Sequence, residues 1–98
     1  MSTLTLKDYE DEVLIRMYDE QIIGNKYISI ERIASKINWK EIQRKYKVRK
    51  NFASVLRHLV NKGYVDPHGK SGNVGSLGRL GVSYVFGRKS AEQRSLGM

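Results

Sequence analysis

The stretch Arg49–Lys62, RKNFASVLRHLVNK, followed by Gly63, decides the fold. At 100° per residue its apolar side chains gather on one side, as in an amphipathic helix packed on a core. These side chains are Phe52, Val55, Leu56, Leu59 and Val60. The opposite side holds only cations and hydrogen-bonding groups, and no acid occurs from 49 to 63. Solvated helix faces usually mix acidic and basic residues, so this face favours an anionic partner.

The charge of the chain is unevenly distributed around this segment. Residues 1–35 contain four Lys and Arg and seven Asp and Glu, a net charge of −3. From residue 36 onward there are fourteen Lys and Arg and three acids, a net charge of +11. A basic surface kept for solubility would also give a positive total, but here the excess coincides with the acid-free helix face. The C-terminal two-thirds is therefore expected to attract a polyanion.

Three further segments precede the deciding stretch. An amphipathic helix, capped by Thr3 or Thr5, has an acidic first turn and stops at Gly24. After the short β-prone segment 27–29, a second helix opens near Ser29. A third helix contains the next apolar stripe, in which Trp39 is expected to anchor the core.

The C-terminal third predicts a β-hairpin and a tail. Tyr64 and Val65 begin one strand, and residues 69–81 form a glycine-rich loop. The second strand is expected over the segment VSYVF, residues 82–86. Glycine recurs at every third position of the loop, but a collagen-like helix is rejected because the loop contains no proline. We expect one domain over residues 1–88 and a polar, basic, disordered tail over 89–98.

A family resemblance follows from residues 41–65. There EIQRKYKV leads through RKNFASVLRHL into VNKGYV. This run resembles the core of winged helix-turn-helix regulators, most closely the MarR- and PadR-like proteins. The resemblance implies an α+β fold of three to four helices followed by a two-stranded β-hairpin wing. The sequence differs from these regulators in two places. The turn at Lys47 and Val48 lacks the usual glycine and is one residue short, and the wing is long and rich in glycine.

The resemblance also implies a mode of binding to double-stranded DNA, with a recognition helix over about 49–62 in the major groove and a wing over 69–81 on the adjacent minor groove or backbone. The candidates for reading bases are Asn51, Ser54, Arg57 and His58. The candidates for binding phosphates are Lys40, Arg44, Lys45, Lys47, Arg49, Lys50, Lys62 and, on the wing, Lys70 and Arg79.

Several other functions are not expected from the sequence. The chain has no cysteine, and its two histidines lack a nearby pair of acids, so we expect no metal site. Ser54 and His58 are four residues apart, but no carboxylate on that face would orient a catalytic triad. We therefore predict no enzyme, no cofactor and no small-molecule ligand. The chain has no apolar run of about 18 residues and no signal-peptide pattern, so we expect a cytoplasmic protein, nucleoid-associated or, in a eukaryote, nuclear.

Three interpretations remain open. The first is a sequence-specific transcriptional regulator, expected to be a homodimer, with Leu14, Ile15, Ile22 and Ile23 as candidates for the dimer contact. The second is an architectural or plasmid-partition protein that spreads along DNA. The third is a winged helix that binds a partner protein. RNA binding is less favoured because few aromatic residues are available for stacking on bases.

Overall fold

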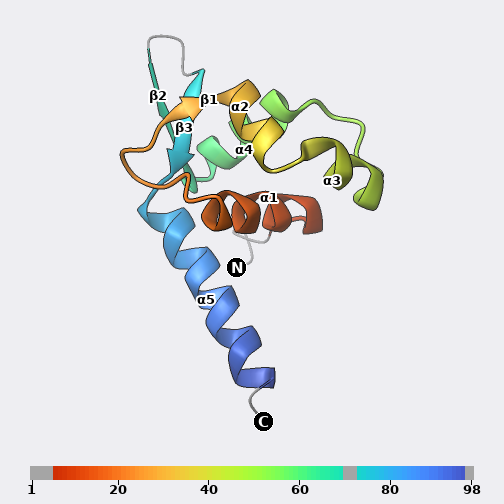
Figure 1. The fold of residues 1–98 in the computed structure, drawn as a ribbon, viewed down its shortest axis with the longest axis vertical. Coiled ribbons are helices and arrows are strands. Elements are labelled where there is room, and N and C mark those ends of the chain that lie inside the picture. The colour runs from red at the N-terminus through yellow and green to blue at the C-terminus, as the bar shows by residue number, and fades with distance from the viewer. Residues whose placement is uncertain (1–5, 70–72, 97–98) are drawn as a thin grey trace.

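The computed structural model describes residues 6–69 and 73–96, with side chains described through residue 89. These residues form an α+β domain of helices and a three-stranded antiparallel sheet. In chain order the elements are α1 (Asp8–Asp19), β1 (Ile28–Ser29), α2 (Ile30–Lys36), α3 (Trp39–Tyr46), α4 (Phe52–Asn61), β2 (Val65–His68), β3 (Val74–Leu77) and α5 (Arg79–Leu96). Figure 1 shows the β2–β3 hairpin at one end of the molecule and the C-terminal part of α5 at the other.

The sheet has the strand order β1-β3-β2, so β3 is its central strand. In the register of the hairpin, Val65 is opposite Leu77 and His68 is opposite Val74. The second strand of the hairpin therefore lies inside the segment 69–81, where the sequence predicted only a flexible loop. The glycines hid this strand because they weaken β-propensity, but at Gly75 they also leave room for the neighbouring strand: a Cβ atom there would lie a tight 3.3 Å from the carbonyl oxygen of Asp66.

The prediction of a strand over residues 82–86 is wrong, because these residues belong to α5. The helix continues to Leu96, where the sequence predicted a disordered tail. Contacts between α5 and α1 explain the outcome. Val85 is fully buried in the core, the Tyr84 hydroxyl donates a hydrogen bond to Asp11 (2.7 Å), and the Arg88 guanidinium donates another to Asp11 (2.8 Å). Tyr84, Val85 and Arg88 are one and three residues apart, and side chains at these spacings share one side of the chain only if the chain is helical.

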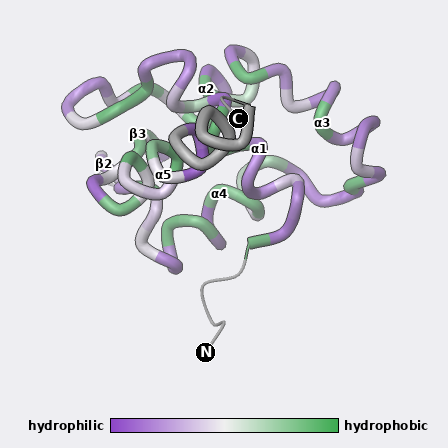
Figure 2. Tube along the Cα trace, turned by 90° about the horizontal axis from the view of Figure 1, so that it is seen from below, coloured by the Kyte–Doolittle hydropathy of each residue, from purple (hydrophilic) through white to green (hydrophobic). Residues whose placement is uncertain are grey.

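One hydrophobic core joins all the helices to the sheet. Trp39 is buried as predicted, with its ring centroid 5.4 Å from that of Phe52. Two of the four residues predicted for a dimer contact, Leu14 and Ile22, are also buried in this core. Figure 2 shows hydrophobic and hydrophilic residues alternating along α1 and α3, as expected of helices that each bury one face.

The ends of two helices are set by local chemistry. Helix α1 begins after Lys7, whose backbone N–H donates to the Glu10 side chain (3.0 Å); the predicted caps, Thr3 and Thr5, lie outside the described residues. The end of α4 agrees with the prediction, because Gly63 follows the helix with a φ of +89°. Glycine adopts this left-handed conformation without the steric cost of a side chain.

The two glycines within α5 predict opposite effects of substitution by alanine. A Cβ atom at Gly81 would collide with the backbone oxygen of Tyr64, whereas at Gly87 it would meet nothing within 4 Å. We expect Gly81→Ala to lower the free energy of unfolding by about 1–3 kcal/mol, since the backbone has to shift. Gly87→Ala should raise it by about 0.5–1 kcal/mol through helix propensity. Urea denaturation followed by circular dichroism measures both, and equal effects would contradict this packing of α5.

Candidate nucleic-acid interface

Helices α3 and α4 are joined by a turn of residues 47–51 that is held by its own hydrogen bonds. Lys47 adopts the left-handed conformation (φ 56°, ψ 45°), at the place where glycine is usual. The Val48 N–H donates to the Gln43 carbonyl (3.0 Å), and the Gln43 side chain donates to the Lys50 carbonyl (3.1 Å). Helix α4 therefore begins at Phe52, and Arg49, predicted to open it, lies in the turn.

The exposed face of α4 brings together three of the four predicted base-reading residues. Ser54, Arg57 and His58 line a shallow hollow of about 260 Å³ with Asn61 and Lys50. The hollow is closed on its other side by Tyr9 and Glu10 of α1, which sequence reasoning missed.

The fourth predicted base-reading residue, Asn51, has a structural role. It is the N-cap of α4, and its side-chain oxygen accepts a hydrogen bond from the Ser54 backbone N–H (2.9 Å). Such a cap stabilises a helix by about 1 kcal/mol. The amide nitrogen of Asn51 and one lone pair of its oxygen therefore remain for a ligand.

A buried carboxylate lies behind this face. The side chain of Glu10 is 1% exposed, and its oxygens lie 2.8 Å from His58 Nδ1 and 3.4 Å from Lys62 Nζ. Burial by itself would raise the pKa of Glu10, but the Lys7 N–H, the His58 ring and the Lys62 charge outweigh it and hold this pKa below its usual value. Lys62, predicted to bind phosphate, is thus only 20% exposed and is directed to Glu10.

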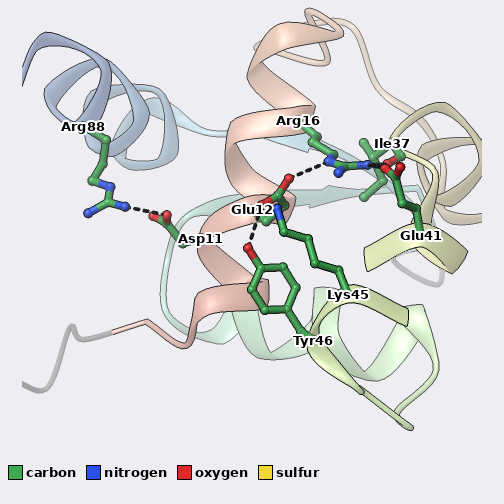
Figure 3. Close-up of polar contacts among 8 residues, drawn as sticks. All are labelled: Asp11, Glu12, Arg16, Ile37, Glu41, Lys45, Tyr46 and Arg88. Atoms are coloured by element: carbon green, nitrogen blue, oxygen red, sulfur yellow. Dashed lines mark hydrogen bonds and ion pairs between the residues drawn. The ribbon is translucent and has the colours of Figure 1, made fainter. Parts of the chain in front are cut away.

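The neighbouring acid Glu12 attaches α3 to α1. Figure 3 shows its carboxylate accepting hydrogen bonds from the Tyr46 hydroxyl (2.8 Å) and from Arg16 Nε (2.9 Å). Lys45 Nζ lies 3.4 Å away. Burial alone would raise the pKa of Glu12, but these partners outweigh that effect and lower it. Lys45 is therefore exposed, as a phosphate-binding residue must be, but is already paired.

Arg16 extends this contact to the end of α2. Its guanidinium donates to the Ile37 carbonyl (2.9 Å) and pairs with Glu41 (2.7 Å), as Figure 3 shows. Glu41 is the only acid from residue 40 to residue 61. Because Arg16 pairs with it, the one acid of this stretch is held by α1.

The remaining predicted phosphate-binding residues differ in position. Lys40 and Arg44 on α3, and Lys47, Arg49 and Lys50 in the turn, are exposed, as is Arg57, and no ion pair is recorded for any of them with another described residue. Arg79 is exposed but is the first residue of α5 rather than part of the hairpin loop. Lys70 lies outside the described residues. The exposed, unpaired cations are thus concentrated on α3, the turn and α4.

The β2–β3 hairpin is held near both ends of its paired strands. The His68 ring stacks on Tyr27 with a centroid distance of 4.0 Å and an interplanar angle of 12°. The Asp66 carboxylate faces Gly78, directly before α5, where negative charge is favourable to the helix dipole. The hairpin is therefore held against both β1 and α5.

The part of the chain that the structure describes contains neither a candidate metal site nor a candidate membrane-spanning helix. No group of three His, Cys, Asp or Glu residues there could hold a metal ion, and no helix there is both long and apolar enough to cross a membrane. Comparison with family models, curated proteins and solved structures gave no match to this chain.

Replacement of Glu10 tests the buried carboxylate. We expect Glu10→Gln to lower the free energy of unfolding by about 1–3 kcal/mol near pH 7, because His58 and Lys62 lose their charged partner. The depressed pKa of Glu10 means that its ionisation stabilises the fold above its usual pKa of 4.5 and that this contribution is lost as the pH falls through the folded-state value.

The difference between wild type and Glu10→Gln in urea denaturation should therefore shrink in acid. Glu31→Gln is the control, because Glu31 is exposed on α2. A Glu10 variant as stable as the Glu31 variant would show that the carboxylate does not hold α1 to α4.

Proposed function

We propose that this protein is a winged-helix protein that binds double-stranded DNA with α4 in the major groove and regulates transcription. The observation that carries the proposal is the distribution of charge on α3, the turn and α4. Apart from Lys45, which pairs with Glu12, their exposed cations make no ion pair with another described residue, and the one acid between residues 40 and 61 pairs with Arg16. A surface of this kind is suited to phosphates, which supply most of the affinity in DNA binding.

The dimensions of DNA give the proposed roles of the residues. The major groove of B-form DNA admits one α-helix. On the exposed face of α4, Ser54, Arg57 and His58 would approach base edges, and arginine suits guanine. Asn51 would donate from its amide nitrogen, because its oxygen already accepts the capping hydrogen bond and a bidentate contact to adenine would have to share that oxygen. Phosphates would be bound by Lys40, Arg44, Lys45, Lys47, Arg49 and Lys50.

The hairpin would serve as the wing. The order of elements from α1 to β3, with α3 and α4 joined by a short turn, is that of the winged-helix arrangement. In this arrangement the hairpin loop, including Lys70, would lie over the adjacent backbone or minor groove, and Arg79 at the start of α5 would reach a nearby phosphate.

A salt titration tests the DNA-binding proposal. We expect the protein to bind a mixed-sequence duplex and to lose at least about tenfold in affinity between about 50 and 200 mM salt, because binding releases counterions. Lys50→Ala with Arg57→Ala should weaken binding strongly. The matched control, Lys26→Ala with Lys89→Ala, removes two charges beside the opposite end of α1 and should leave the affinity nearly unchanged. Fluorescence anisotropy measures all three proteins.

The outcomes separate the alternatives. Absence of binding at low salt, or equal effects of the two double variants, would overturn the proposal and favour a protein partner. Competition by random DNA distinguishes a regulator, which should retain its preferred site, from an architectural or partition protein that spreads along DNA.

The predicted homodimer needs a different surface from the one the sequence suggested, because Leu14 and Ile22 are in the core. Among the described residues, the large hydrophobic side chains that are exposed are Leu80 (45%) and Phe86 (62%), both on α5. These two residues are six apart in the chain and so lie about 120° apart around the helix, and we propose that a second copy packs around Phe86, the more exposed of the two. Phe86→Ser should convert a dimer to a monomer in sedimentation equilibrium while the helical signal is kept. A wild-type monomer at all concentrations would refute the dimer.

A further inference from the structure

His58 is the one residue of the proposed reading face that is joined to a buried charge. Its side chain is 52% exposed, and its Nδ1 atom lies 2.8 Å from the carboxylate of Glu10, which is 1% exposed. An ionised carboxylate only accepts hydrogen bonds, so the ring must carry a proton on Nδ1 to make this contact. In a neutral ring, Nε2 then has no proton and is an acceptor.

We propose that Glu10 fixes this tautomer and so makes Nε2 of His58 a proton-dependent contact to DNA. Nε2 lies across the ring from Nδ1 and therefore points away from the buried carboxylate, towards the exposed side of α4. The neutral ring presents an acceptor there, which suits the amino groups of cytosine or adenine. The protonated ring presents an N–H donor and a positive charge, which suit guanine N7 and O6 or a phosphate oxygen. The inference rests on the proposed DNA-binding function.

The charges around the ring determine the direction of the effect. Glu10 favours the protonated ring. Three cations oppose it: Lys50 from the turn, Arg57 on α4 and Lys62 after α4, while the neutral phenol of Tyr9 lies on the α1 side. Phosphates bound to this face would offset the cations, so DNA favours the protonated ring. Complex formation would then take up one proton from solvent onto Nε2, and the affinity for DNA should fall as the pH rises.

The first measurement concerns the free protein. Long-range ¹H–¹⁵N spectra of the imidazole rings report which nitrogen carries the proton, and at about pH 8, above the usual titration range of histidine, we expect His58 to show the Nδ1–H form. The commoner Nε2–H form, or an equal mixture, would overturn the inference whatever the protein does with DNA.

The second measurement is the affinity for a mixed-sequence duplex between about pH 6 and 8 at constant ionic strength. We expect wild type to bind about three to ten times more tightly at the lower pH, within the limit set by one proton. His58→Gln should have an almost flat profile. The same comparison is made in a His68→Gln background, because His68 is the second of the two histidines and lies on β2 of the proposed wing, stacked on Tyr27. His58→Gln should remove the same pH dependence there as in wild type.

The failures of the two proposals are distinguishable. Binding that depends on salt but not on pH, or a pH dependence that persists in His58→Gln, would overturn the role of His58 and leave DNA binding standing. Absence of binding at every pH and low salt would overturn the DNA-binding proposal and, with it, the contact of His58 to DNA.

Discussion

Three consecutive carboxylates at the start of α1 attach this helix to three other helices. Glu10 binds His58 and Lys62 in and after α4, Asp11 binds Tyr84 and Arg88 of α5, and Glu12 binds Lys45 and Tyr46 of α3. Successive residues on a helix point 100° apart, so three adjacent acids can face three different neighbours. The relative placement of α3, α4 and α5 therefore depends on one turn of α1.

This arrangement gives the uneven charge of the chain a structural meaning. The acids of the first 35 residues do not simply balance the basic remainder, because three of them bind partners inside the molecule. A buried carboxylate needs partners, because an unpaired buried charge costs several kcal/mol. Lys62 and, in part, Lys45 meet this need, so they stabilise the fold at the expense of their availability to a ligand. The cations of the turn and Arg57 have no such role and remain exposed.

Structural features that depend on the periodicity of one segment were predicted correctly from the sequence. Features that depend on contacts between distant segments were not. The core face of α4 and its end at Gly63 follow from spacing alone. Residues 82–86 are mostly Val, Tyr and Phe, as in a strand, yet they are helical: Val85 is buried in the core and Tyr84 bonds to Asp11 of α1, about 70 residues away in the chain. The exposure of Arg57 could be predicted, because this residue lies opposite the apolar face of the helix. The pairing of His58 and Lys62 could not, because Glu10 lies on a different element.

The position of Glu10 also bears on how a crowded basic surface can be stable before any partner binds. Lys50 and Arg57 line the hollow and Lys62 pairs with Glu10 behind it, and these like charges repel one another. A carboxylate on the exposed side would remove this repulsion but would also repel phosphates. A carboxylate buried beneath the hollow offsets part of the repulsion through the protein interior, where charges are less screened than in solvent. The same group thus stabilises α4 and leaves the positive potential directed outward.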